Sequence, residues 1–244
     1  MEALADPDCG WFYRVNADGF GVIPGSPVAY WASNALTLSF LNSTCLEDVA
    51  NPVEGIKTGD TNRHLRYWFE VSRTREHLIH NDPETALWRK MCKGGEYRKW
   101  YGNNEYVCRW GLNGRELARD SKACVSNKEF LYAPAFNWTY ISSGNFAARK
   151  AGYDSLYNNK GPACYSSSNL LNTLLGAMNS SYAQLVLDIT SPTLDYKPGG
   201  VGHTPVPKSP IGEVDSNVER CVVLSRADWD AFELSWEFTR NPLV

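Results

Sequence analysis

The clearest periodicity of apolar positions along the chain lies between residues 168 and 190. Apolar side chains recur there at the spacing of a helix that buries one face: Leu170, Leu171, Leu174, Leu175 and Met178. Serines precede the first leucine, as is typical of a helix N-terminus. The segment therefore predicts one long helix. Residues 191–210, which follow it, are so rich in proline and glycine that they predict an extended connection.

Two further segments show helix signals. Residues 23–42 open with a Pro-Gly turn, after which Ser26 can act as the N-cap and the next proline can occupy the first helical position. The segment DPETALWRKM, residues 82–91, predicts a short helix that ends before a Gly-Gly pair.

Four other segments have the aromatic and β-branched composition of strands. They are TNRHLRYWFEVS (61–72), EYVCRWG (105–111), FLYAPAFNWTYIS (130–142) and CVVLS (221–225). Pro134 interrupts the third segment, which predicts an edge strand or a bulge there. An acidic segment that contains tryptophan, residues 228–238, follows the fourth and predicts an amphipathic structure.

Composition bounds the class of protein. The chain has 244 residues, 43% of them hydrophobic, which is enough for one large domain, or a domain with a smaller appendage, with a real core. It contains no run of about 18 apolar residues, and its start, MEALADPDCGW, lacks the plan of a signal peptide. We therefore expect a cytoplasmic protein without a membrane partner. The seven cysteines are odd in number and form no C-x-x-C pair, which argues against a metal site and a disulfide framework.

The net charge of −3 conceals an uneven distribution of charged residues along the chain. Residues 57–160 contain 18 of the 24 Lys and Arg residues but 11 of the 27 Asp and Glu residues, an excess of 7 positive charges. The rest of the chain has 6 basic and 16 acidic residues, an excess of 10 negative charges. Because a local field attracts a polyanion, this division permits nucleic-acid binding by the middle of the chain. A merely solvated charged face is the alternative.

Motifs of the common catalytic sites do not occur in the sequence. A Gly-rich turn after a strand, which would hold S-adenosylmethionine, is missing, and so is the Asn/Asp-Pro-Pro-aromatic loop with which adenine-N6 methyltransferases hold a flipped base. The two Asn-Pro pairs, at 51 and 241, continue with Val and Leu instead. A P-loop, an H-E-x-x-H helix and a G-x-S-x-G turn are also missing. His77 and His80 lie close together, but on a stretch typical of the surface.

Three polar, glycine-bearing segments in the basic half remain as candidate binding sites. They are residues 54–66, 93–105 and 139–149. Glycine lets a backbone approach a phosphate closely, while Arg, Lys and Asn supply donors to phosphates and base edges. The alternative interpretation is that these segments are ordinary turns.

Taken in order, these segments resemble the target-recognition region of the adenine-specific DNA methyltransferases of BREX phage defence, the PglX family. The resemblance rests on six blocks, namely IPGSPVAYW (23–31), GIKTGDTNRHLRYWFEV (55–71), KGGEYRKWYGNNEYVCRW (93–110), TYISSGNFAAR (139–149), KGPACY (160–165) and ELSWEF (233–238). The third block is too long and unusual for chance agreement. Residues 170–207 are also similar to the helix and proline exit that close the recognition domains of type I specificity subunits.

The resemblance implies a parent enzyme that is an S-adenosylmethionine-dependent N6-adenine methyltransferase acting on double-stranded DNA, with this chain as the part that reads the sequence. It implies an α+β fold of the DNA target-recognition-domain type, in which a curved, mixed or antiparallel sheet carries the basic loops and the long helix near 168–190 packs behind it. The expected organisation is a lead-in segment 1–50 from the catalytic domain, a recognition domain 51–210 and a C-terminal strand and acidic tail 211–244. We expect this chain alone to be non-catalytic and to hold no cofactor, because the catalytic blocks do not occur in it.

DNA contacts are expected from loops and strand ends that enter the major groove, with Lys and Arg on phosphates and Asn and Arg on bases. The predicted contact residues are Lys57, Thr58, Asn62, Arg63, Lys93, Arg98, Lys99, Asn103, Asn104, Ser142, Ser143, Asn145 and Arg149. Four aromatic residues, Trp100, Tyr101, Trp110 and Trp138, are interpreted as core rather than as platforms for stacked bases.

Two other function classes stay open. A protein-interaction module that binds other BREX proteins or a phage inhibitor would suit the acidic flanks. A carbohydrate-binding module would account for the Trp and Tyr content, but it would not need the basic excess in the middle of the chain.

Overall fold

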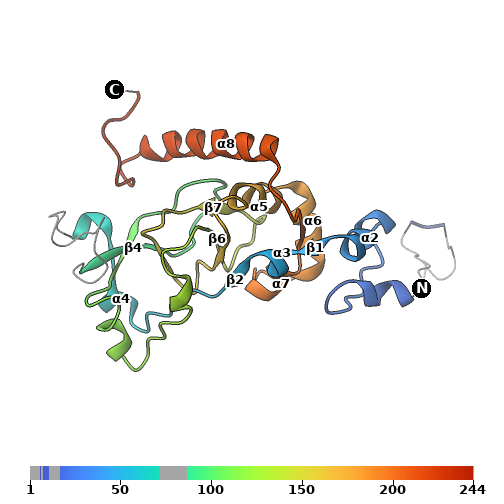
Figure 1. The fold of residues 1–244 in the computed structure, drawn as a ribbon, viewed down its shortest axis with the longest axis horizontal. Helices are drawn as coiled ribbons and strands as arrows, with labels where there is room; N and C mark the ends of the chain where they lie inside the picture. Colours follow the sequence, from blue (N-terminus) through green and yellow to red (C-terminus); the bar gives the residue numbers. More distant parts are fainter. Residues whose placement is uncertain (1–5, 7, 11–16, 72–86, 244) are drawn as a thin grey trace.

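A computed structural model of the chain describes residues 6, 8–10, 17–71 and 87–243 and has the mixed α and β architecture that the sequence predicts (Figure 1). The strands are β1 (Thr44–Cys45), β2 (Asn51–Val53), β3 (Leu65–Tyr67), β4 (Trp88–Cys92), β5 (Tyr106–Arg109), β6 (Ala135–Trp138), β7 (Ala148–Lys150), β8 (Leu156–Tyr157), β9 (Ala163–Tyr165) and β10 (Pro205–Val206). The α-helices are α2 (Asn34–Asn42), α3 (Leu46–Val49), α4 (Thr61–His64), α5 (Leu171–Met178), α6 (Ser181–Thr190), α7 (Pro198–Gly202) and α8 (Gly212–Asp230). Four 3-10 turns join them: η1 (Ala17–Val22), η2 (Trp68–Glu70), η3 (Leu117–Arg119) and η4 (Lys128–Phe130).

The first sheet has the strand order β2-β9-β6-β7, and all its neighbours are antiparallel. Its core side chains Phe136 and Trp138 are fully buried and pack with Leu174 and Leu175 of α5. The indole Nε1 of Trp138 donates a hydrogen bond of 2.8 Å to the carbonyl of Tyr196, so its polar atom is satisfied inside the core. β6 begins directly after Pro134 and lies inside the sheet, so the predicted edge strand is wrong: the proline precedes the strand and leaves its hydrogen bonds intact.

The second sheet has the order β3-β5-β4-β8, with β4 and β8 parallel and the other pairs antiparallel. Trp110 and Leu117 are fully buried beneath it, which for Trp110, as for Trp138, confirms the interpretation as core. Residues 88–92 form a strand here, so the helix predicted over 82–91 is wrong for its described part, and residues 82–86 lie outside the described residues. The alternation of buried Arg89, half-buried Lys90 and buried Met91 is the two-residue period of a strand inserted between β5 and β8.

The helical pattern near 168–190 is divided into two consecutive helices, α5 and α6, in place of one. The division falls at Asn179 and Ser180. Ser180 caps α6 by accepting a hydrogen bond of 3.1 Å from the amide of Ala183. The Asn179 side chain turns to the first sheet, where its Oδ1 accepts from Ala148 N at 2.9 Å and its Nδ2 donates to Ala148 O at 3.0 Å.

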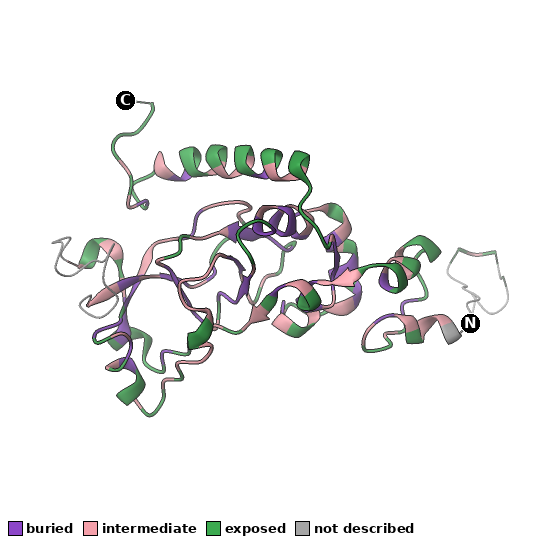
Figure 2. Cartoon of the chain, viewed as in Figure 1, coloured by how far each residue is buried: buried purple, intermediate pink, exposed green. Residues whose placement is uncertain are grey.

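Helix α8 runs along one side of the molecule against α5, with its outward side exposed (Figures 1 and 2). The predicted strand CVVLS lies within this helix, so that prediction is wrong. Val214, Val218 and Val222 stand four residues apart and face α5, and this helical period outweighs the β-branched character of the valines. Gly176 of α5 permits the close approach, because a Cβ there would lie 2.8 Å from a methyl carbon of Val214.

Two other local predictions need correction. The first helix begins at Asn34 with Ser33 as its N-cap, whereas Ser26 adopts a positive φ of 46° in a turn that cannot start a helix. The segment 191–210 is more than an extended connection, since Pro198 at the first helical position allows α7, and β10 then pairs with β1. Phe40 of α2 packs against α6, so the N-terminal segment adjoins the helical side of the fold. Among the described residues, no helix has the length and apolar character needed to cross a membrane.

Candidate nucleic-acid interface

The structure brings two of the three predicted binding segments together, residues 93–105 and 139–149. Thr139 Oγ1 donates a hydrogen bond of 3.0 Å to the carbonyl of Gly95. The backbone of Trp100 pairs with the edge of β7, donating to Ala148 O at 2.9 Å and accepting from Lys150 N at 2.8 Å. The two segments therefore form one continuous loop surface beside the first sheet.

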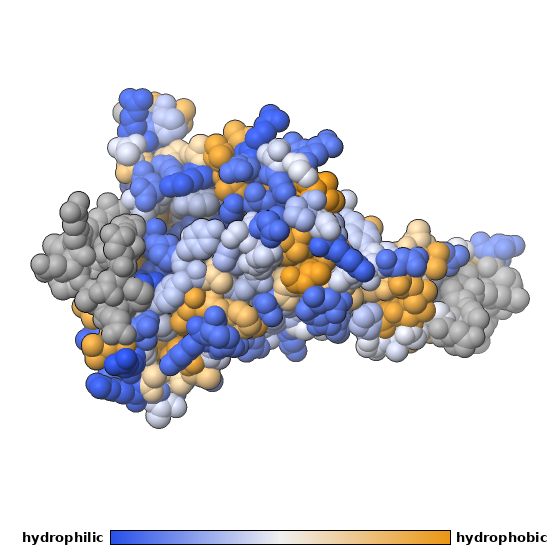
Figure 3. Space-filling model, viewed as in Figure 1, coloured by the Kyte–Doolittle hydropathy of each residue, from blue (hydrophilic) through white to orange (hydrophobic). Residues whose placement is uncertain are grey.

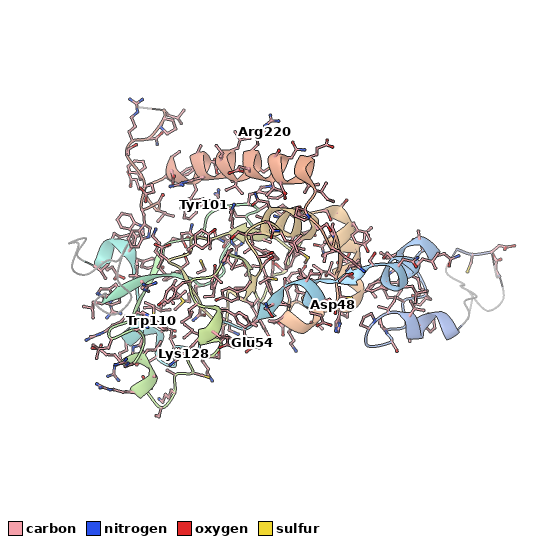
Figure 4. All side chains as sticks on the ribbon, viewed as in Figure 1. Asp48, Glu54, Tyr101, Trp110, Lys128 and Arg220 are labelled. Atoms are coloured by element: carbon pink, nitrogen blue, oxygen red, sulfur yellow. The ribbon has the colours of Figure 1, made fainter. Side chains whose placement is uncertain are left out.

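Helix α8 contacts part of this surface through Arg98, and three cations of the surface have partners within the protein. Arg98 Nη1 lies 2.7 Å from a carboxylate oxygen of Asp228, and its guanidinium lies 5.0 Å from the ring centre of Trp229. Lys99 Nζ donates to the carbonyl of Asn179 at 2.7 Å. Lys93 Nζ lies 4.6 Å from the ring centre of Tyr106. Tyr101 is half-buried below α8 (Figure 4).

Three of the predicted contact residues have buried side chains, which leaves no surface to present to DNA. Arg149 is 1% exposed and donates to Arg98 O and to Thr139 Oγ1, both at 3.3 Å. Burial lowers the pKa of Arg149 to about 10. Asn103, 4% exposed, donates from Nδ2 to Glu96 O at 2.9 Å. Thr58 is also 4% exposed. The contacts expected of these three residues do not fit their positions.

Other predicted residues on the same surface are accessible. Ser143 and Asn145 are exposed, while the half-buried Ser142 accepts a hydrogen bond of 3.1 Å from Gly144 N at its hydroxyl. Asn104 is half-buried beneath the C-terminal segment, where its carbonyl accepts from Trp236 Nε1 at 3.0 Å.

The third predicted segment, residues 54–66, lies against residues 109–124 instead. Lys57 and Cys124 exchange two backbone hydrogen bonds, of 3.0 and 2.7 Å. Asp60 caps α4 by accepting from Arg63 N at 3.1 Å, and this cap leaves the side chains of Asn62 and Arg63 exposed. Lys57 is exposed as well.

A hollow of about 260 Å³ opens where these segments meet, and we call it the arginine pocket. Its lining residues are Arg63, His64, Arg109, Glu116, Arg119 and Asp120. The sequence analysis missed Arg109 and Arg119. The run RELARDSK at 115–122, in which basic side chains recur every three or four residues, is a signal that could have pointed to Arg119, whereas Arg109 lies outside it in a predicted strand.

Asp120 holds the pocket together. Its carboxylate accepts from His64 Nε2 at 2.9 Å and from the backbone of Lys122 at 3.0 Å. The hydrogen bond from His64, then that from Lys122 and the charge of Arg63, lower the pKa of Asp120 from its ordinary value. At neutral pH the carboxylate is therefore ionised and hydrogen-bonded to His64 and to the backbone of Lys122.

We expect Asp120→Asn to lower stability at neutral pH and to matter less as the solution becomes acidic. Because the folded-state pKa of Asp120 is lowered, its stabilisation is fully present above the ordinary pKa of about 4 and is lost as the pH falls through the lowered value. Urea unfolding of both proteins between neutral and acidic pH measures the difference. A difference that stays constant over this range would contradict the assignment.

The described residues contain no group of three or more His, Cys, Asp and Glu side chains placed to hold a metal ion.

Comparison with known proteins gives the chain a family context. No protein-family model matches it. It is 33% identical over 256 aligned residues to the adenine-specific methyltransferase PglX of Lacticaseibacillus casei (strain Zhang). This alignment covers 100% of the chain and 21% of PglX. It is 35% identical over 237 aligned residues to the adenine-specific methyltransferase BrxX of Escherichia coli O9:H4 (strain HS). This alignment covers 96% of the chain and 19% of BrxX. The chain thus spans about a fifth of the length of these curated relatives, and over that span it is homologous to the BREX adenine-specific methyltransferases.

Proposed function

We propose that the chain contributes sequence-specific recognition of double-stranded DNA to an S-adenosylmethionine-dependent N6-adenine methyltransferase of phage defence. Similarity over the whole chain to two adenine-specific methyltransferases carries this proposal. The basic excess of residues 57–160 supports it, because a duplex attracts local positive charge. The division into a lead-in segment 1–50, a recognition domain 51–210 and a tail 211–244 belongs to the same proposal.

Within the described part of the chain, the glycine pair that follows a strand does not fit the cofactor of such an enzyme. Gly94 and Gly95 follow β4, as the glycines of a cofactor turn follow a strand, but the chain continues into a loop and not into a helix. A Cβ on Gly94 would lie 2.6 Å from Lys160 O, and one on Gly95 would lie 2.8 Å from Asn103 Nδ2. Protein atoms thus occupy the space that these glycines leave, so we assign S-adenosylmethionine binding to other parts of the parent enzyme.

Exposed polar side chains are the best candidates for contact with the duplex. Lys57 and Arg63 can hold phosphates, while Asn62 and Asn145 can reach base edges. Arg98 would have to exchange its ion pair with Asp228 for one with a phosphate.

We expect the 244-residue chain to bind duplex DNA weakly and with a strong dependence on salt. Each phosphate that a basic side chain neutralises releases counterions, so log affinity should fall linearly with log salt concentration, by about 0.9 per contact. Fluorescence anisotropy of a labelled duplex at several salt concentrations measures this slope. Uncharged maltooligosaccharides are the control ligand for carbohydrate binding. No DNA binding at low salt, or binding that ignores salt, would refute the proposal.

Protein interaction is a second candidate function, and one observation favours it. Large apolar side chains are exposed near the N-terminal helix, with Trp31 at 55% and Leu41 at 60%. Figure 3 shows hydrophobic surface at the α2 end of the molecule. Such side chains suit a partner protein better than a phosphate backbone. If the titration shows no DNA binding, docking to other BREX proteins or to a phage inhibitor becomes the better explanation.

A further inference from the structure

The arginine pocket is built on a rigid support. Trp110 and Leu117, which follow the lining residues Arg109 and Glu116 in the chain, are fully buried in the hydrophobic cluster of the second sheet. Gly114 has a φ of 79°, and a Cβ there would lie 2.6 Å from the Trp110 ring, so the turn is tightly packed on the indole. Trp110 Nε1 also donates to Asn113 Oδ1 at 3.2 Å. The loop that presents Arg119 is therefore held in place before any ligand arrives.

The carboxylates of the pocket are already engaged. Asp120 accepts from His64 and from the backbone of Lys122, and Glu116 pairs with Arg109 Nε at 3.2 Å. Through these contacts the two carboxylates hold the side chains of His64 and Arg109 in place.

Two guanidinium groups remain available to a ligand. The Arg63 side chain is 71% exposed, and its Nη1 reaches Asp120 only at 3.9 Å. Arg119 is exposed, and within the described residues its side chain forms no hydrogen bond or ion pair. Exposed Lys57 and Lys122 lie on the paired segments beside the pocket, where a Cβ on Gly59 would lie 2.7 Å from the Lys122 carbonyl carbon.

The charge of the pocket selects among anions. Apart from His64, its ionisable lining comprises three arginines and two carboxylates, which leaves one net positive charge. A phosphodiester carries one negative charge and presents two equivalent oxygens, which match the fork of a guanidinium. The dianion of a free phosphate would lie close to Glu116 and Asp120 and would be repelled by them.

We propose that the arginine pocket binds one backbone phosphodiester of duplex DNA, with Arg119 and Arg63 as its ligands. This proposal rests on the proposed function. It adds a defined phosphate site that fixes the position of the duplex relative to the second sheet, whereas base reading is left to other residues.

The test compares four forms of the 244-residue chain: wild type, Arg119→Ala, Arg119→Lys and Arg220→Ala. Arg220 is the matched control, because it is also an exposed arginine but projects from α8, outside the pocket (Figure 4). Duplex affinity is measured by anisotropy at several salt concentrations. We expect Arg119→Ala to weaken binding roughly tenfold and to lower the salt slope by about one. Arg119→Lys should recover the slope but only part of the affinity, and Arg220→Ala should resemble wild type.

The remaining outcomes separate the possible failures. If wild type binds DNA and Arg119→Ala binds equally well, the pocket assignment is overturned while DNA recognition stands. Failure of wild type to bind DNA overturns both proposals. Binding of poly-L-glutamate, measured at the same ionic strength, provides the third arm. If Arg119→Ala weakens the binding of poly-L-glutamate as much as the binding of DNA, the pocket binds polyanions in general and the phosphodiester assignment is overturned. Thermal melting of each variant shows that the comparisons involve folded protein.

Discussion

Gly161→Ala is expected to cost the protein about 3 kcal/mol of stability, at the upper end of the range for overpacking a tight site. Gly161 lies where the loop between β8 and β9 crosses the end of β4. A Cβ there would lie 2.7 Å from Gly94 N and 2.8 Å from Cys92 O. These are backbone atoms, and Cys92 O also accepts from Asn158 N at 2.9 Å, so neither segment can move without breaking the junction of the second sheet.

Urea unfolding of the variant and of Gly199→Ala measures this effect. Gly199 is the matched control, because a Cβ there meets no atom within 4 Å and the residue lies in α7. Its replacement should be neutral or stabilising by up to about 1 kcal/mol. Equal midpoints for the two variants would show that the crossing is looser than the distances indicate.

Arg149→Ala is expected to cost about 3 kcal/mol of stability, because it empties a fully buried site and removes two hydrogen bonds. The lost donors are those to Arg98 O and Thr139 Oγ1, which join the two loop segments beside the first sheet. DNA affinity per folded molecule should change little, since the side chain is 1% exposed. Denaturant unfolding and anisotropy at a temperature well below the unfolding transition measure the two quantities separately.

Arg149→Met is the comparison variant for this site. It keeps most of the side-chain volume but removes the charge, and the Nε of Arg149 is buried without a hydrogen-bond partner in the described structure. Its loss of stability should therefore be smaller than that of Arg149→Ala. An Arg149→Ala protein that keeps wild-type stability and loses DNA affinity would restore the direct contact inferred from the sequence.

The fold class and several elements could be predicted from the sequence because their signals are local. Apolar spacing marks α5, and the composition of residues 105–111 marks β5. Errors arose where tertiary packing decides between two local possibilities. The valines of α8 favour a strand until α5 supplies a helical surface for them, and Trp88–Cys92 becomes a strand because β5 and β8 flank it.

The candidate site was harder to predict because its contacts join residues far apart in the chain. Arg98 meets Asp228 across 130 positions, so its ion pair could not be seen in the basic run around it. The arginine pocket joins residues 63–64 to 109–120 through the His64–Asp120 contact, a separation of 56 positions. Sequence patterns supplied the residue types, whereas the fold decides which of them face water.

The hydrogen bonds of Asn179 have a consequence for the solubility of the protein. β7 is the last strand of its sheet, and an outer strand with open backbone groups is a template on which another chain can add a strand. The carboxamide of Asn179 satisfies both backbone groups of Ala148, while Trp100 N also donates to Ala148 O and Trp100 O accepts from Lys150 N. The side-chain amide of Asn179 thus makes the two hydrogen bonds that a peptide group of a further strand would make to Ala148. Because these groups of β7 are already paired, we expect this edge of the sheet to resist β-augmentation and edge-to-edge aggregation.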